Sequence, residues 1–175
     1  RVNLIGEHTD YNQGYVLPAA LDKDVLLLCR AREDSLVRVQ NVENVYASRE
    51  FHIAPEIPSQ AVGDWANYAQ GPAQLLAREC GSTLRGMDAL VDGSSPHGIP
   101  RGSGLSSSSA LTVVTAVALV GLNDLNLAGA ALADACGRAE WYVGTRGGIM
   151  DQFSAVLARR DHALFLDCRP RGQAT

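Results

Sequence analysis

The chain has 175 residues, of which 46% are hydrophobic and 19% charged, and its formal net charge is −4 at pH 7. This length is typical of one domain with a hydrophobic core, and the composition excludes general disorder. The acidic balance argues against a nucleic-acid partner, and no apolar run reaches the roughly 18 residues of a membrane-spanning helix. The four cysteines are widely spaced and form no zinc-type pattern, so we expect free thiols in a reducing cytoplasm.

Three β-strands are predicted in the first third of the chain. Residues 24–31 and 35–42 are rich in Val and Leu, and the second range alternates apolar and polar residues. The turn-like sequence REDS lies between them, so the two strands are expected to form an antiparallel hairpin. Residues 49–53 are expected to add a third strand.

The rest of the chain predicts three helices and two more strands. Asp64 is a suitable N-cap for the first helix, although Pro72 interrupts the middle of it. The expected ranges are 64–80, 109–122 and 127–143 for the helices, and 86–93 and 163–168 for the strands. The second helix is hydrophobic nearly all round, which predicts burial. Strands first and mixed elements afterwards predict an α+β fold.

The sequence PRGSGLSSSSAL, residues 100–111, is the first motif that points to chemistry. Glycines let a backbone approach an anion closely, and a helix N-terminus adds partial positive charge. Serine hydroxyls donate to phosphate or bind magnesium. A flexible linker does not fit a segment that joins a strand directly to a buried helix, and the common P-loop pattern is absent. A phosphate-binding loop and a tight turn capped by serine both remain open.

Polar residues gather in two other places. The first is RVNLIGEHTDYN, which packs Arg1, Glu7, His8 and Asp10 into ten residues. Side chains of this kind suit the many hydroxyl groups of a sugar, although ordinary surface charges would give the same pattern. The second is AEWYVGTRGGIMDQ, residues 139–152. It contains a glutamate and an aspartate suited to holding magnesium and to facing an acceptor hydroxyl, respectively, as phosphoryl transfer requires.

Taken together, these motifs resemble galactokinases, which belong to the GHMP small-molecule kinase superfamily. RVNLIGEHTDYN is similar to the galactokinase signature, PRGSGLSSSSAL to the phosphate-binding motif of the superfamily, and GIMDQF to its catalytic segment. The similarity runs from Arg1 to about Cys168. It implies a sugar- and ATP-binding N-terminal domain over residues 1–175, truncated at both ends, with a mixed or antiparallel sheet and packed helices. The C-terminal domain is expected to be absent, and the isolated chain to be inactive.

The resemblance implies an ATP- and magnesium-dependent kinase that phosphorylates the C1 hydroxyl of galactose, with no nucleic-acid, membrane or protein partner. It assigns Asp151 and Arg1 as the catalytic pair. The sugar-binding residues that it implies are Glu7, His8, Asp10 and Gly148. Those for ATP are Trp65, Gly102, Ser103, Gly104, Leu105, Ser106, Ser107 and Ser108, with Trp65 near the adenine. Ser108 and Glu140 are the implied magnesium ligands.

Two departures from the galactokinase pattern bear on the sugar. Many galactokinases have a cysteine where this chain has Gly147, and eleven positions separate Glu140 from Asp151, one fewer than expected. The shorter segment resembles N-acetylgalactosamine kinases, so a kinase for that sugar is an alternative. A galactokinase-like protein that senses sugar and nucleotide without turnover is another. Galactose remains the favoured substrate because GEHTDYN and GIMDQF match galactokinases.

Overall fold

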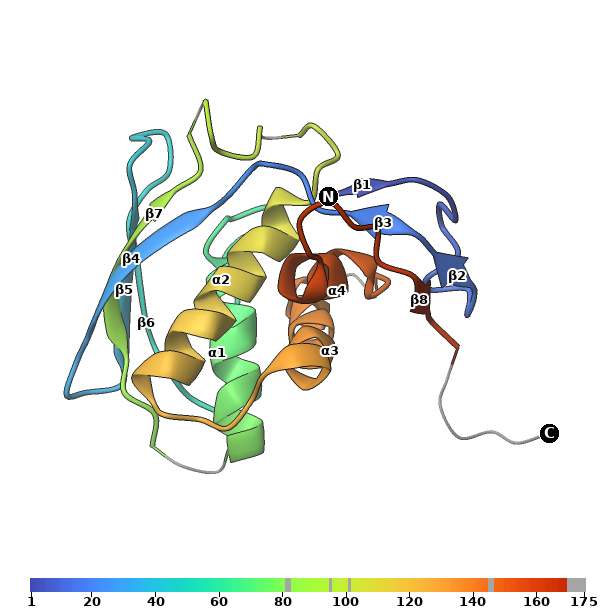
Figure 1. Cartoon of the computed structure of the whole chain (residues 1–175). Helices are drawn as coiled ribbons and strands as arrows, with labels where there is room; N and C mark the ends of the chain where they lie inside the picture. Colours follow the sequence, from blue (N-terminus) through green and yellow to red (C-terminus); the bar gives the residue numbers. More distant parts are fainter. Residues whose placement is uncertain (81–82, 95, 101, 145–146, 170–175) are drawn as a thin grey trace.

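The computed structural model describes residues 1–80, 83–94, 96–100, 102–144 and 147–169, which form a mixed four-stranded sheet with helices stacked on one face (Figure 1). The strands lie in the order β4 (Leu26–Ala31), β7 (Met87–Asp92), β5 (Leu36–Asn41) and β6 (Arg49–His52). The α+β fold expected from the sequence is confirmed. So is the third strand, because β6 pairs antiparallel with β5.

The two strands rich in Val and Leu exist, but their expected pairing as a hairpin is wrong. β7 lies between them, antiparallel to β4 and parallel to β5. Gly86 enters the mouth of the turn: its N–H donates to the Asp34 carbonyl at 2.7 Å, and its carbonyl accepts from the Arg32 N–H at 3.0 Å. A Cβ at Gly86 would lie 1.9 Å from the Leu36 carbonyl oxygen, so β7 starts here only because this residue has no side chain.

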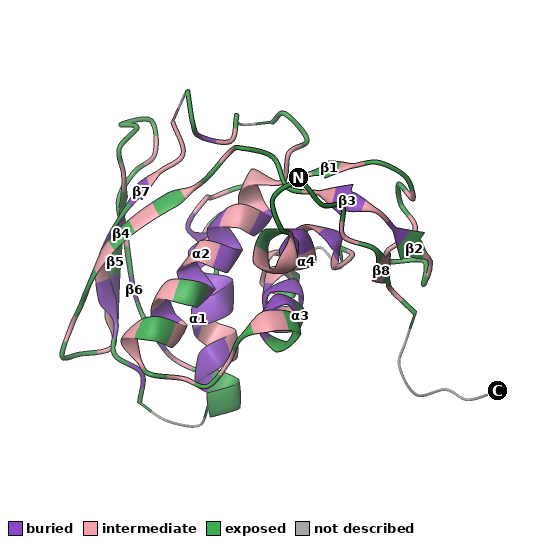
Figure 2. Ribbon diagram, viewed as in Figure 1, coloured by how far each residue is buried: buried purple, intermediate pink, exposed green. Residues whose placement is uncertain are grey.

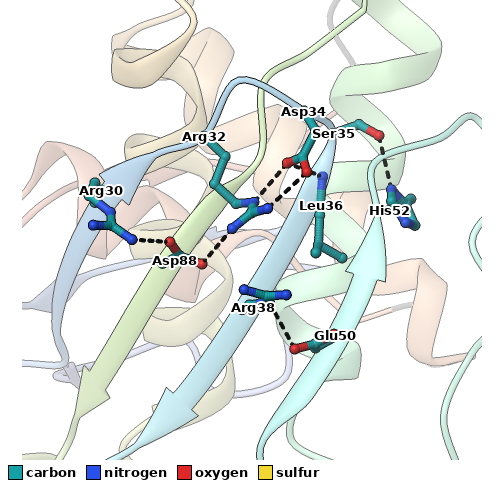
Figure 3. Close-up of polar contacts among 9 residues, drawn as sticks. All are labelled: Arg30, Arg32, Asp34, Ser35, Leu36, Arg38, Glu50, His52 and Asp88. Carbon is teal, nitrogen blue, oxygen red and sulfur yellow. Dashed lines mark hydrogen bonds and ion pairs between the residues drawn. The ribbon is translucent and has the colours of Figure 1, made fainter.

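The two faces of the sheet differ in polarity, as alternation along each strand requires. The inward residues of β5 and β7 are buried beneath the helices (Figure 2): Val37, Val39, Met87, Ala89 and Val91. On the outer face, Asp88 accepts hydrogen bonds from Arg30 and Arg32, and Arg38 pairs with Glu50 (Figure 3). The helices therefore cover one face, and an ion-pair network covers part of the other.

The helices are α1 (Asn67–Cys80), α2 (Ser107–Leu122), α3 (Gly129–Ala139) and α4 (Met150–Leu157), with a 3-10 turn, η1 (Glu140–Val143), after α3. The helix expected over 127–143 is thus divided in two, and Gly144 ends it in the left-handed region at φ 84°. α1 begins three residues after Asp64, so Asp64 is not its N-cap. The Asp64 carboxylate accepts the Ala66 N–H, in the turn before the helix. α4 has no counterpart among the predicted elements. Leu76 on α1 and Leu119 on α2 are fully buried in the hydrophobic core that these helices form with the sheet.

Four two-residue strands fasten the N-terminal segment beside α4. β1 (Val2–Asn3) pairs with β3 (Pro18–Ala19), and β2 (Tyr15–Val16) pairs with β8 (Leu166–Asp167). β8 is shorter than the strand expected over 163–168. Residues 1–19 therefore lie next to segments more than a hundred residues away in sequence (Figure 1). Among the described residues, no helix has the length and apolar character needed to span a membrane.

The insertion of β7 makes a specific demand on Gly86. Gly86→Ala is expected to lower the free energy of unfolding by about 1–3 kcal/mol, because the added methyl group overlaps the Leu36 backbone. Gly121→Ala is the matched control, since nothing lies within 4 Å of a Cβ there, in the last turn of α2. The control is expected to be neutral or stabilising by up to about 1 kcal/mol. Equal urea midpoints for the two variants would contradict this account of the strand order.

Candidate active site

Asp151 is held from two sides by residues distant in sequence. It lies in the first turn of α4, where Arg1 Nε donates to its Oδ1 and Ser106 Oγ donates to its Oδ2 at 2.5 Å. The side chains of Arg1 and Asp151 are 18% and 25% exposed, so the pair is partly shielded from water. Arg1 Nη1 also donates to the Gly104 carbonyl at 3.3 Å. The structure thus joins the two residues assigned to catalysis and connects both to the loop of residues 102–108, the serine loop.

The serine loop has three residues in the left-handed backbone region. Gly102, Gly104 and Ser106 have φ values of 67°, 71° and 61°. Nothing lies within 4 Å of a Cβ at either glycine, so these positions favour glycine for its backbone conformation and not for lack of space. Ser106 is the N-cap of α2 and makes no side-chain cap bond, because its hydroxyl is directed to Asp151. The free amide groups of the first turn of α2 remain available to an anion.

The hydroxyls of this loop have different surroundings. Ser103 donates to the Pro100 carbonyl at 2.6 Å and so stabilises the loop itself. Ser107 and Ser108 line the larger of two cavities at this site, and Ser109 is buried. Leu105 lines a second cavity of about 300 Å³ that also contacts Arg1 and Asp151. Of the residues assigned to the triphosphate, Ser107 and Ser108 therefore face the larger cavity, whereas Ser103 and Ser106 have hydrogen-bond partners within the protein.

The larger cavity has a volume of about 920 Å³, and its lining contains two chemically different groups of residues. Ser107 and Ser108, at the N-terminus of α2, form the first group. The second group is aromatic: Tyr46, Trp65 and Tyr68. This volume lies within the range of small-molecule sites, and a lining with both aromatic rings and a helix N-terminus suits a molecule with a flat ring and an anionic tail.

Asp10 lies against the turn that leads into α4. Its Oδ2 accepts the Met150 N–H at 3.4 Å, and a Cβ at Gly148 would lie 1.6 Å from the same oxygen. Gly148 is therefore required for the close approach of Asp10. Glu7 and His8 belong to the same N-terminal turn as Asp10 but are exposed. The structure thus brings Asp10 and Gly148 into contact beside Asp151.

His8 is fixed by two side chains that the sequence did not single out. Its φ is 59°, and Asn12 Nδ2 donates to its carbonyl at 2.7 Å. The Tyr11 hydroxyl lies 2.6 Å from His8 Nδ1. These contacts hold the imidazole in one direction at the surface of the turn, although the ring is exposed.

Glu140 begins η1 and has a carboxylate oxygen, Oε1, that is buried without a hydrogen-bond partner. Burial raises the pKa of Glu140, and the charge of Asp151 raises it further, whereas hydrogen bonds from Ser109 and Gln152 act in the opposite direction. Gln152 Nε2 also donates to Ser109 Oγ at 3.3 Å, and both side chains are buried. Glu140 is thus set in a small buried polar cluster with Ser109 and Gln152.

These donors fit a magnesium ion. Magnesium binds through one or two carboxylates and takes its other ligands from water and substrate phosphates. An unpartnered buried carboxylate oxygen at Glu140, beside the serine loop, has that character. The described residues contain no group of three or more His, Cys, Asp or Glu side chains able to hold a metal by themselves. The hydroxyl that bonds to Glu140 is that of Ser109, whereas Ser108, the expected ligand, lines the larger cavity.

Sequence reasoning missed Ser109 and Gln152, the partners of Glu140. It assigned Ser106 to phosphate but missed its bond to Asp151. The sequence gives little signal for Ser109 and Gln152, because α2 is hydrophobic nearly all round and α4 is too short for a clear helical period. A buried polar side chain needs a partner, and here the partners come from different helices.

Two family models match the chain. One, described as the GHMP kinases N terminal domain, covers residues 67–159, and the other, the galactokinase galactose-binding signature, covers residues 1–31. The fold and the site together define a domain of a small-molecule kinase. The chain belongs to the GHMP kinase family.

Relatives in this family include galactokinases. The chain is 44% identical over 171 residues to the galactokinase of Chloroflexus aggregans and 43% identical to that of Chloroflexus aurantiacus. In each case the match covers 97% of this chain and 42% of the relative, so the chain spans less than half of their length. The resemblance to galactokinases seen in the sequence is confirmed.

Solved structures show the same fold. The crystal structure of Lactococcus lactis galactokinase complexed with galactose matches with a TM-score of 0.83 and 35% identity, over 95% of this chain and 42% of that one. The Methanococcus jannaschii mevalonate kinase matches with a TM-score of 0.77 and 17% identity, over 98% of this chain and 53% of that one. The second likeness is one of fold alone.

The buried charge of Glu140 predicts opposite effects on stability and on metal binding. The raised pKa means that stability is lost as pH rises above the ordinary carboxyl value of 4.5. Glu140→Gln removes this charge at similar shape, so the metal-free variant is expected to melt at a higher temperature at neutral pH, with no gain below pH 4.5. Magnesium with nucleotide should then stabilise the variant less than the wild type.

Scanning calorimetry of the full-length protein at neutral pH and below pH 4.5 measures these effects. Each scan is run with and without magnesium and nucleotide. Glu56→Gln is the control, because Glu56 is exposed and the same substitution there removes no buried charge. A lower melting temperature for Glu140→Gln at neutral pH without metal would contradict the assignment, and so would an unchanged response to magnesium.

Proposed function

We propose that the protein to which this chain belongs is a galactokinase, which transfers the γ-phosphoryl group of ATP to the C1 hydroxyl of galactose. One observation carries the proposal: Asp151 is bonded both to Arg1, in the segment that matches the galactose-binding signature, and to Ser106, in the serine loop. A sugar bound at the first segment and a phosphate bound at the second would meet at this carboxylate. The names of the relatives and the galactose-bound Lactococcus structure support the choice of sugar.

On the acceptor side, galactose would bind against the turn formed by Glu7, His8 and Asp10, with a backbone contact at Gly148. The C1 hydroxyl would then face Asp151. Each carboxylate oxygen has two lone pairs, so Asp151 can accept this hydroxyl while it keeps its bonds to Arg1 and Ser106. Asp151 would orient the hydroxyl and take its proton as the bond to phosphorus forms.

On the donor side, ATP would lie in the larger cavity, with its base toward Trp65 and its triphosphate at the serine loop, residues 102–108. Amide groups of the loop and of the first turn of α2 would bind phosphate oxygens. Magnesium, held by Glu140 with Ser108 or its neighbour Ser109, would supply positive charge to the triphosphate. Arg1 lies beside Asp151 and would offset charge on the phosphoryl group in transit.

The same proposal extends to partners and location. The only ligands proposed are the sugar, ATP and magnesium, without a nucleic acid or a membrane. A cytoplasmic location is part of the proposal, and it is supported by the four cysteines, which are free in the structure.

A kinase for N-acetylgalactosamine is the second candidate, and the short segment between Glu140 and Asp151 favours it. Residues 145–146 of that segment lie outside the described residues. A sensor without turnover is less well supported, because Asp151 and its two partners are all present and bonded. A coupled assay for ADP release, run beside calorimetric binding of sugar and nucleotide, separates a kinase from a sensor.

The catalytic assignment predicts a large effect at one carboxylate. In the full-length protein, Asp151→Asn is expected to lower kcat at least about a hundredfold, since the amide cannot take a proton from the acceptor hydroxyl. ATP affinity should change little. Asp134→Asn is the control, because Asp134 is an exposed residue paired with Arg138 on α3. Near-normal galactose-dependent ADP release by Asp151→Asn would rule out this role.

The short segment between Glu140 and Asp151 predicts that more than one sugar is accepted as a substrate. Galactose is expected to be the best substrate, with measurable phosphorylation of galactosamine-type sugars, because a shorter connection leaves room beside C2. Values of kcat/KM for galactose, N-acetylgalactosamine and glucose measure this. A clear preference for N-acetylgalactosamine would favour the second candidate, and a preference for glucose would refute both.

A further inference from the structure

An ion pair outside the residues assigned so far lies beside the aromatic residues of the larger cavity. Arg49 on β6 donates to Asp64 Oδ2 through Nε at 3.1 Å and through Nη2 at 2.6 Å. The Asp64 side chain is 11% exposed and that of Arg49 31%, so the pair is better shielded than Arg38–Glu50 on the outer face of the sheet. Both residues line the cavity.

The two oxygens of Asp64 have separate partners. While Oδ2 receives both Arg49 bonds, Oδ1 accepts the Ala66 N–H at 3.0 Å and shapes the turn before α1. The ion pair therefore joins the start of β6 to the turn that carries Trp65.

A second hydrogen bond attaches Trp65 to the segment that leads into β6. Its Nε1 donates to the Ala47 carbonyl at 3.1 Å, and its ring packs edge-on against Tyr46 at a centroid distance of 6.0 Å. The indole is thus fixed between residues 46–49 and the turn at Asp64. If the ion pair were lost, the indole would keep one bond to a segment no longer fastened to that turn.

We propose that Arg49 and Asp64 are positioning residues for the base of the nucleotide: their ion pair fixes Trp65 as one wall of the base site and so determines affinity for the base, not for the triphosphate. The inference rests on the proposed function, since it takes the larger cavity as the nucleotide site. The residues proposed to bind the triphosphate belong to other elements, the serine loop and α2. A change at the ion pair should therefore weaken binding of the base and leave binding of the triphosphate unchanged.

Asp64→Asn is the first test. The variant keeps an oxygen for the Ala66 N–H but presents an amide NH₂ group to the Arg49 guanidinium, so it removes the ion pair and retains the turn. In the full-length protein, affinity for a non-hydrolysable ATP analogue is expected to fall at least about fivefold, because a partly shielded ion pair and the order it imposes are lost. Affinity for inorganic tripolyphosphate should stay within about twofold. KM for ATP should rise while kcat changes little.

Glu50→Gln is the matched control. Glu50 follows Arg49 on β6, but it pairs with Arg38 on the opposite face of the sheet (Figure 3), and its side chain is 58% exposed. This variant also removes one ion pair from the same strand, and its nucleotide affinity should equal that of the wild type. If Asp64→Asn fails to fold, Arg49→Lys takes its place with the same measurements, because lysine keeps the charge but has one nitrogen and cannot replace both Nε and Nη2.

A double-mutant cycle with Trp65→Ala tests whether the ion pair acts through the indole. If it does, Asp64→Asn adds little to the loss of nucleotide affinity already caused by Trp65→Ala. An equal loss in both backgrounds overturns the inference, and so does an equal loss of tripolyphosphate and nucleotide binding. Unchanged nucleotide binding by Asp64→Asn does the same. If the wild type itself binds no nucleotide, the proposed function fails, a result distinct from these.

Discussion

The site depends on one carboxylate with two partners. Asp151, on α4, accepts hydrogen bonds from the guanidinium of Arg1, which directly precedes β1, and from the hydroxyl of Ser106, in the serine loop. The three residues are distant in sequence. The antiparallel pairs β1–β3 and β2–β8 hold the N-terminal segment beside α4, so that Arg1 can reach Asp151. Because the carboxylate is partly shielded and bonded on both oxygens, its direction is set before any substrate binds. Such preorganisation is what phosphoryl transfer asks of a protein, since the reaction needs positioning more than covalent chemistry.

The surroundings of Asp151 divide into regions with different tasks. Asp10 and Gly148 form a close-packed turn on one side, and the serine loop leads into the larger cavity on the other. Glu140 adds a buried negative charge, which destabilises the metal-free fold and fits a site built for a cation. The Arg49–Asp64 pair lies beside Trp65 in the lining of the cavity, so the proposed base and phosphate regions rest on different elements.

Local sequence predicted the elements better than their pairing. Ranges rich in Val and Leu correctly indicated β4 and β5, but such a pattern says only which residues are extended and, where it alternates, which face is buried. Which strand lies beside which is decided by long-range contacts, and here Gly86 admits β7 between two strands that a short turn connects. The eight residues of α4 were missed because they follow two glycines and are too few to give a clear helical period.

The α+β class, the glycine- and serine-rich loop at a helix N-terminus, and the three motifs of one kinase family could all be predicted from the sequence alone. These features depend on residue type and spacing, which are local. Three other features depend on the folded chain: the bond from Ser106 to Asp151, the contacts of Ser109 and Gln152 with Glu140, and the Arg49–Asp64 pair in the cavity lining. These partners are between 12 and 45 positions apart in the sequence, and no local pattern encodes such a contact. A hydrogen bond forms between the groups that folding brings within about 3 Å, and that choice belongs to the packing of the whole domain.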